Sequence, residues 1–302
     1  MQIDREKFFA GYRRRFNSLS QQQVNGLNFI LDSAEKDRFL LHIEWLAYML
    51  ATTKLETAHT FQPVHEYGGR NYFIRRYGSQ TRVGRGLGND TPEEGAYYAG
   101  RGDVQLTGES NYERAEEALR KQYPELIADF EQRTGKVFDL TVGDQPNDLN
   151  DPNNAQDPAI AYAIMSFGMR TGMFTGRKLS DYIGEGRTDY RTARKIINGM
   201  SGADIIAGYA REFEAILKES VTQVYDWSVP TDQPRVLKLG MEGEDVMRLQ
   251  HELVVYAFLS PEGVTGMFDE ATDEGVRGFQ MANGLKVDGK VGPNTGRVLF
   301  GE

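Results

Sequence analysis

The stretch FLLHIEWLAYMLATTKLE, from Phe39 to Glu56, decides the fold of this 302-residue chain. It is apolar nearly all round, and a helix with that pattern must be covered on every side by other elements. The most apolar part ends at Thr53 after about 15 residues and includes His42 and Glu44, whereas a membrane span needs about 20 apolar residues. The stretch therefore predicts the buried central helix of a mainly helical domain.

Helical signals continue on both sides of this stretch. Ser20 and Gln23 form an S-x-x-Q capping box, which predicts a helix start at Ser20. The segment from His59 to Asn111 is rich in Gly, Tyr, Arg and Asn and has little periodicity, so we expect loops and a short hairpin there. Further helices are predicted over Tyr112–Tyr123, Pro158–Met169, Asp189–Ile197 and Ala203–Leu217.

A different kind of sequence follows the segment around Pro230 and Pro234. There, VTGMFDEAT (264–272) and VDGKVGPNT (287–295) align at an offset of 23 residues. Each copy has a Gly where a turn needs a positive φ and ends in Thr near the start of a helical pattern. We predict a catalytic domain over 1–228, a linker over 229–235 and a small helical domain over 236–302.

Composition excludes several classes of function. The chain has no cysteine, which excludes disulfides, cysteine-ligated metals and thiol nucleophiles. Its net charge of −9 comes without a basic stripe, so neither nucleic acid nor membrane insertion is expected. The N-terminal MQIDREKFFAGYRRRF lacks a secretory signal pattern, so we expect synthesis in the cytoplasm.

Two carboxylates stand close to the end of the apolar stretch. Glu56 ends it, and Glu66 follows ten residues later beyond Pro63. A break at Pro63 would let the chain bring Glu66 back across Glu56 at the roughly 6.5–9.5 Å that an inverting glycosidase needs. Burial disfavours the charged form of a carboxyl, so Glu56 is the candidate acid and Glu66 the candidate base. Two solvated surface charges are the alternative.

The run YYAGRGDVQLTGESNY, from Tyr97 to Tyr112, resembles the signature of glycoside hydrolase family 19. The resemblance extends to Glu56–Thr57 and to the runs FGMRTGMFTGRKLSDY (167–182), ARKIINGM (193–200) and AGYAREFEAIL (207–217), and thus covers roughly residues 40–220. The family contains chitinases and many phage endolysins. The resemblance implies a lysozyme-like α-helical catalytic domain with a loop-rich cleft.

The resemblance also implies roles for individual residues. Glu56 is the general acid, Glu66 the general base, and Thr107 helps to hold the attacking water. Arg211 lies near Glu56 and adjusts its proton affinity. The sugar is contacted by Gln105, Asn111, Tyr112 and Asn198.

Each binding assignment has a purely structural alternative. Asn111 and Asn198 are also suited to capping helices, and Arg211 to a solvated helix face. The chain departs from the family pattern at Asp103, where an apolar or aromatic residue is usual; Asp103 is either a surface residue or a third carboxylate that alters the pH profile. His59 and His65 lack the spacing of a zinc motif, so no metal or cofactor is expected.

The tail from Val236 to Leu299 resembles the peptidoglycan-binding module of cell-wall hydrolases, whose family fold is a small three-helix bundle. Its core positions include Val246, Leu249 and Phe279. We therefore expect a monomeric endolysin that cleaves the β-1,4 glycan strands of peptidoglycan with inversion, after delivery from the host cytoplasm to the wall in the periplasm. The alternatives are a chitinase, a non-catalytic wall-binding protein and a zinc amidase.

Overall fold

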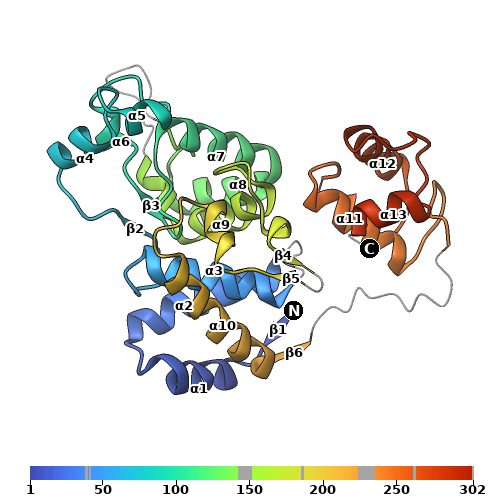
Figure 1. The fold of residues 1–302 in the computed structure, drawn as a ribbon, viewed down its shortest axis with the longest axis horizontal. Helices are drawn as coiled ribbons and strands as arrows, with labels where there is room; N and C mark the ends of the chain where they lie inside the picture. The colour runs from blue at the N-terminus through green and yellow to red at the C-terminus, as the bar shows by residue number, and fades with distance from the viewer. Residues whose placement is uncertain are drawn as a thin grey trace. The chain divides into compact units, whose positions relative to one another are not determined.

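The computed structural model describes residues 1–37, 40, 42–141, 152–184, 187–223, 235–260 and 263–300. The chain divides into two compact units, Met1–Gln223 and Val224–Glu302. Both are built mainly of helices (Figure 1), which confirms the predicted fold class. The predicted linker over 229–235 lies outside the described residues except for Arg235.

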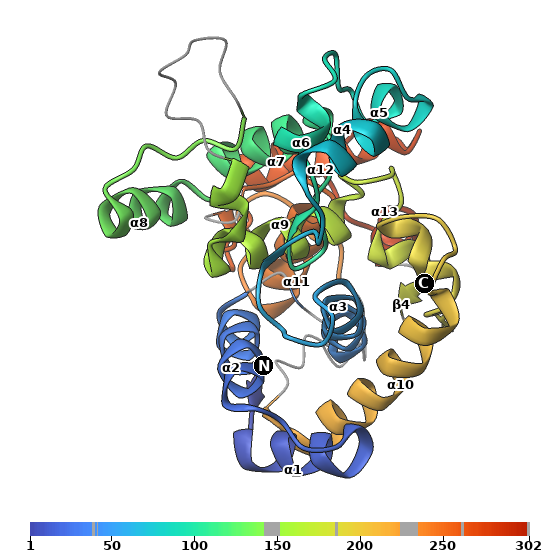
Figure 2. The same ribbon diagram turned by 90° about the vertical axis from the view of Figure 1, so that its left-hand side faces the viewer.

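Helix α3 (Ile43–Glu56) is the centre of the first unit, and its residues from Trp45 to Lys54 are all buried. Figure 2 shows α3 between α2 (Gln21–Lys36) and α10 (Ala203–Ser220), with α1 (Arg5–Phe16) across one end. The contacts of α3 are most extensive with α10. The apolar stretch thus forms the buried helix that its sequence predicts.

Lys54 shows how this helix accommodates a charged residue in the core. Its ammonium donates a 2.9 Å hydrogen bond to the hydroxyl of Tyr12 and lies within 5.5 Å of the ring centres of Tyr12, Phe16, Phe61 and Tyr209. Burial lowers the pKa of Lys54 to about 8, while the faces of the rings favour the cation.

The remaining elements of the first unit surround this helical centre. The capping box at Ser20 and Gln23 is present at the start of α2, as predicted. The segment expected to be loops also contains three short helices, and Asp189–Ile197 forms only a 3₁₀ turn, Thr192–Ile196. The other bounds are α4 Arg70–Tyr77, α5 Arg82–Gly86, α6 Glu94–Tyr97, α7 Glu109–Gln122, α8 Pro124–Thr134, α9 Pro158–Thr171, and 3₁₀ turns Pro152–Gln156 and Leu179–Asp181.

Short antiparallel strand pairs tie distant segments together. In the first, β1 (Gln2–Ile3) pairs with β6 (Val221–Gln223) and joins the two ends of the unit. In the second, β2 (Val64–His65) pairs with β3 (Arg101–Gly102), which joins two separate segments. The short hairpin expected in this region corresponds to the antiparallel bridge between Arg101 and Leu106. The third joins β4 (Ile183–Gly184) to β5 (Arg187–Thr188).

The chain reverses directly after α3, and Pro63 is not the cause. The helix ends at Glu56, and Ala58, His59 and Phe61 all adopt positive φ, between 48° and 69°. Such a conformation is unfavourable for residues with a Cβ, at roughly 1–3 kcal/mol each. The Thr57 side chain stabilises the reversal, because its hydroxyl donates to the carbonyl of Thr53 and accepts from the amide of Phe61.

The second unit contains the predicted three helices, α11 (Glu244–Val255), α12 (Glu270–Ala282) and α13 (Pro293–Phe300). The two copies of the repeat are held by equivalent buried glutamines. The amide oxygen of Gln250 accepts from the amides of Thr265 and Gly266, and that of Gln280 accepts from Asp288 and Gly289. Their amide nitrogens donate to the hydroxyls of Thr272 and Thr295.

The threonines that end the two repeat copies lie inside helices α12 and α13 and do not cap them. The N-cap of α12 is Asp269, whose carboxylate accepts from the amide of Thr272, so Thr272 is inside the first turn. The two threonines serve as buried partners of the glutamines. The two repeat glycines, Gly266 and Gly289, have φ of 78° and 69°, as predicted.

Candidate active site

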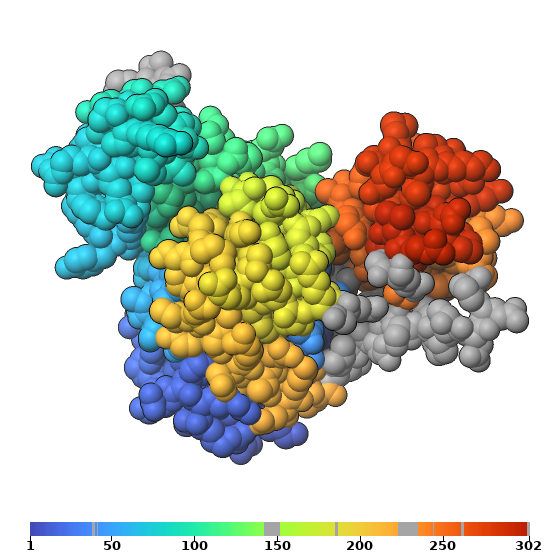
Figure 3. Space-filling model, in the orientation of Figure 1, coloured from blue at the N-terminus to red at the C-terminus, as the bar shows by residue number. Residues whose placement is uncertain are grey.

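A polar cleft of about 280 Å³ lies in the first unit and gathers six of the eight predicted site residues. One side comes from the region of α4 and α5, through Tyr77 and Leu87, and the other comes from Phe174, Ile197 and Asn198. These sides belong to the cyan and yellow surfaces in Figure 3. The predicted residues that line the cleft are Glu56, Glu66, Gln105, Thr107, Asn111 and Asn198.

Glu56 enters the cleft from the last turn of α3, and polar and charged side chains lie near it. Tyr48 and Thr52 precede it at intervals of four residues, so the three share one face of the helix. The Glu56 Oε1 atom lies 2.7 Å from Nη1 of Arg194, and the two side chains are 18% and 6% exposed. The carboxyl of Glu56 therefore faces a buried cation at the cleft.

The cation beside Glu56 is Arg194, which corrects the prediction for Arg211. Arg211 is exposed on α10 and forms no ion pair with Glu56, whereas Arg194 projects from the 3₁₀ turn Thr192–Ile196. The Arg194 Nε donates to the carbonyl of Ser201, which fixes the plane of the guanidinium. A sequence signal for this residue exists, because Arg194 lies in the run ARKIINGM only four residues before Asn198.

Glu66 follows strand β2 and is held as a hydrogen-bond acceptor. Its backbone amide donates to the carbonyl of Gly100 at 2.7 Å, which continues the β2–β3 pairing. The hydroxyl of Tyr77 donates to Glu66 Oε1 at 3.0 Å, and the amide of Gly100 donates to Oε2 at 3.4 Å. A Cβ at Gly100 would lie 2.8 Å from Oε1 of Gln105 and 3.2 Å from Oε2 of Glu66, so a larger residue would displace these two side chains.

Tyr77, which sequence reasoning missed, is a fixed proton donor to Glu66. Burial is the main cause that raises the pKa of Tyr77 to about 12, so its hydroxyl keeps its proton at neutral pH. The Nε of Arg76 donates to the same hydroxyl at 2.9 Å, which completes a chain from Arg76 through Tyr77 to Glu66. Helix α4 thus orients the second carboxylate.

The turn between β3 and α7 places polar groups on the floor of the cleft. The backbones of Arg101 and Leu106 exchange two hydrogen bonds, and Gln105 between them has a φ of 56°. The Thr107 hydroxyl donates to the carbonyl of Gln105, and the Asn111 amide donates to the carbonyl of Thr107. The hydroxyl oxygen of Thr107 therefore keeps its lone pairs for another hydrogen-bond donor.

The run Tyr97–Tyr112 divides into a cleft-lining part and a buried part. Tyr112 is fully buried, and its hydroxyl donates to the carbonyl of Ala99 and accepts from Nη1 of Arg101. Arg101 is buried as well and donates further to the carbonyls of Tyr97 and Ala99. The prediction that Tyr112 lines the sugar site is wrong, because its role in the structure is to support the turn from beneath.

The structural alternatives for the two asparagines hold in part. Asn111 lies inside the first turn of α7, whose N-cap is Gly108, so Asn111 is not the cap. The side-chain oxygen of Asn198 accepts from the amide of Gly199 at 2.8 Å, while the residue itself is exposed at the cleft. Both residues line the cleft, and the Asn111 side chain is held there by the carbonyl of Thr107 and the guanidinium of Arg114.

Asp103 does not belong to the cleft. It is 2% exposed, which excludes a surface residue, and it lines a separate cavity. Burial raises the pKa of Asp103 to about 7.

The two histidines near the cleft are occupied by local contacts. His65 Nδ1 lies 2.7 Å from the carbonyl oxygen of Glu66, and His59 packs edge-on against Tyr209. Within the described ranges, no three His, Asp or Glu side chains gather in an arrangement that could bind a metal ion. No helix in the described part of the chain is long and apolar enough to cross a bilayer.

Comparison with known proteins gives a family for part of the second unit. Residues 242–299 match the family described as "Putative peptidoglycan binding domain". A 65-residue stretch is 38% identical to "Probable N-acetylmuramoyl-L-alanine amidase" of Bacillus licheniformis, and it covers 21% of this chain and 18% of that protein. A crystal structure of a chitinase C mutant aligns with 73% of this chain and 95% of its own, at 18% identity and a TM-score of 0.39.

Proposed function

We propose that this protein is a cell-wall hydrolase that cleaves the β-1,4 glycan strands of peptidoglycan with inversion, using Glu56 as acid and Glu66 as base. The observation that carries the proposal is the cleft itself. It presents two carboxylates in different environments together with the amides of Gln105, Asn111 and Asn198. Paired carboxylates with distinct surroundings are what acid–base glycoside hydrolysis requires.

The acid side of the reaction depends on Glu56 and Arg194. Protonated Glu56 gives its proton to the glycosidic oxygen as the bond to the sugar carbon breaks, and a carboxylate is left behind. The guanidinium of Arg194, 2.7 Å from Glu56 Oε1, stabilises that developing negative charge. A fixed positive group aimed at charge that forms during the reaction lowers the barrier without reorganisation.

The base side depends on Glu66 and its donors. As a carboxylate, Glu66 takes a proton from the water that attacks the opposite face of the sugar. The hydroxyl of Tyr77 and the amide of Gly100 fix the orientation of both carboxylate oxygens. We propose that the Thr107 hydroxyl, which donates to the carbonyl of Gln105, accepts a hydrogen bond from the same water through a lone pair of its oxygen.

Peptidoglycan is favoured over chitin by the second unit. The match of residues 242–299 to a peptidoglycan-binding family supports attachment to the wall polymer. Attachment raises the local concentration of glycan at the cleft, which increases cleavage without any new contact there. We further propose that the protein is a phage-type endolysin that acts on the wall in the periplasm.

Product analysis tests this function. Purified peptidoglycan is digested by the full chain, new reducing ends are labelled with borodeuteride, and the fragments are identified by mass spectrometry. Labelled MurNAc ends are the expected product and identify a muramidase. Labelled GlcNAc ends would mean that the same acid–base mechanism cleaves the other glycosidic bond of the strand. Released peptides without labelled ends would identify an amidase and overturn the proposal, as would cleavage confined to a parallel chitin sample.

A further inference from the structure

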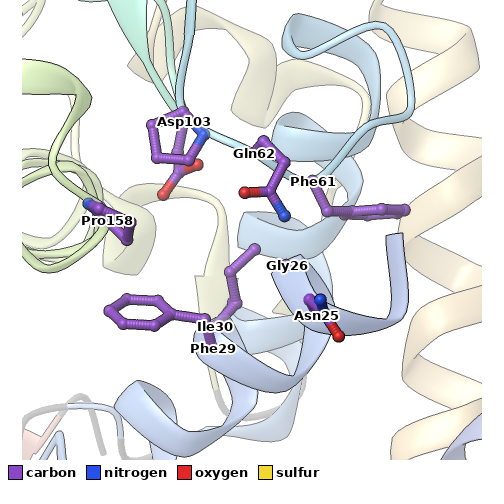
Figure 4. Close-up of a pocket in the computed structure, with 9 residues that line it drawn as sticks. Asn25, Gly26, Phe29, Ile30, Phe61, Gln62, Asp103 and Pro158 are labelled. Carbon is purple, nitrogen blue, oxygen red and sulfur yellow. The ribbon is translucent and has the colours of Figure 1, made fainter. Parts of the chain in front are cut away.

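A second cavity of about 210 Å³ lies in the first unit and shares no lining residue with the cleft. It is bounded by α2, the reversal after α3, the turn after β3 and the start of α9 (Figure 4). Most of its wall is apolar. The lining residues are Asn25, Gly26, Phe29, Ile30, Phe61, Gln62, Pro63, Asp103 and Pro158.

Asp103 is the charged member of this wall, and the fold gives it no partner. Its side chain is 2% exposed, and its Oδ1 atom is buried without a hydrogen-bond donor. Figure 4 shows its carboxylate pointing into the cavity, between Gln62 and Pro158. A buried carboxyl without a partner lowers stability, so its presence calls for an explanation outside the packing of the core.

The charge of the lining residues favours a cation as the occupant of this cavity. No Lys, Arg or His lines it, and burial alone accounts for the raised pKa of Asp103. A cation that donates to Asp103 would supply the missing counter-charge and hydrogen bonds, and such charge-assisted bonds are about twice as strong as neutral ones. An anion would be repelled by Asp103, and no cationic side chain of the lining would offset that repulsion.

The size of the cavity limits the occupant further. An apolar cavity of about 150 Å³ holds benzene, so 210 Å³ accommodates one ring together with a short charged group. Phe29 and Phe61 offer aromatic walls, and Phe29 is 38% exposed at the rim. We propose that this cavity is a second binding site, for a primary ammonium group on a body about the size of a benzene ring, with Asp103 as the anchor.

Three probes of similar size test the charge requirement. Benzylamine, benzyl alcohol and benzoate are titrated into the full chain at pH 8 and followed by calorimetry. Benzylamine is expected to bind at least tenfold more tightly than benzyl alcohol, and benzoate is expected not to bind. In Asp103→Asn this preference for the amine is expected to disappear, since the anchor charge is removed while the shape is kept.

Two further variants show where the amine binds and distinguish a lost contact from a misfolded protein. Glu66→Gln removes a carboxylate of the cleft and should leave benzylamine binding unchanged. Asn25→Asp adds a carboxylate at the exposed rim of the cavity and should tighten binding of the amine alone. No binding of benzylamine, equal binding of the three probes, unchanged preference in a folded Asp103→Asn, or loss of binding in Glu66→Gln would each overturn the proposal.

Discussion

Replacing Asp103 with Asn should make the first unit more stable, and the gain should depend on pH. Asp103 is buried with no partner for Oδ1, and burial raises its pKa from 3.8 to about 7. The folded state therefore holds this proton more tightly than the unfolded state does. The stabilisation that the bound proton provides is fully present below about pH 4 and is lost as pH rises through about 7.

The size of the effect follows from the shift. A change from 3.8 to about 7 corresponds to about 4 kcal/mol, at roughly 1.4 kcal/mol per pKa unit. Asn imitates the protonated side chain and does not titrate. The two proteins should therefore unfold with similar free energies at pH 4, and the variant should be more stable by up to about 4 kcal/mol at pH 8.

Urea unfolding at pH 4, 6 and 8 measures this difference. A Trp227→Phe background leaves the buried Trp45 of α3 as the fluorescent reporter of the first unit. Asp204→Asn is the matched control, because Asp204 is 79% exposed and its pair with Arg191 should contribute little. A difference between the Asp103 variant and its parent that stays constant from pH 4 to pH 8 would refute the reasoning.

Three other substitutions test the contacts described above. Arg194→Met leaves the largely buried Glu56 without its cation and should lower the free energy of unfolding by about 3 kcal/mol, with a smaller loss when Glu56→Gln is also present. Tyr77→Phe removes the hydroxyl that donates to Glu66 and should reduce reducing-end release about tenfold, equivalent to about 1.4 kcal/mol, while circular dichroism is unchanged. Gln280→Leu leaves buried amides of a repeat loop unpaired and should destabilise the second unit by about 3 kcal/mol in thermal unfolding, together with loss of wall pull-down.

Neighbouring residues provide controls for these three. Lys195→Met, Tyr72→Phe and Met281→Ala alter exposed side chains beside Arg194, Tyr77 and Gln280 and should leave stability and activity unchanged. Equal losses for a variant and its control would mean that the specific contact does not matter. Full activity of the Tyr77→Phe protein would contradict the role of the Tyr77 hydroxyl in orienting Glu66.

The sequence predicted the elements whose signals are local. Ten consecutive buried residues in α3 follow from an apolar stretch with no polar face, and the start of α2 follows from its capping box. The short helix α4 was missed because RNYFIRRY carries little apolar periodicity and its only buried residue is Phe73. Its importance comes from one long-range contact, the hydroxyl of Tyr77 on Glu66.

The candidate site was predictable to the extent that its residues share one run of sequence. Gln105, Thr107 and Asn111 reach the cleft because the turn after β3 carries them together. That Tyr112 is buried depends on its contact with Arg101 in the folded chain, which no spacing specifies. Arg194 was missed for the same reason, since its contact with Glu56 joins residues 138 positions apart.

Rates of reducing-end release from purified peptidoglycan by the parent, Glu56→Gln and Glu44→Gln proteins test the central claim most directly. Glu44 lies on the same helix as Glu56, at its opposite end, so its substitution controls for general effects on α3. Glu56→Gln is predicted to lose about 10²- to 10⁴-fold in rate, as expected for a general acid, while Glu44→Gln keeps the parent rate. A folded Glu56→Gln protein that releases ends as fast as the parent would contradict the assignment of Glu56 as the acid.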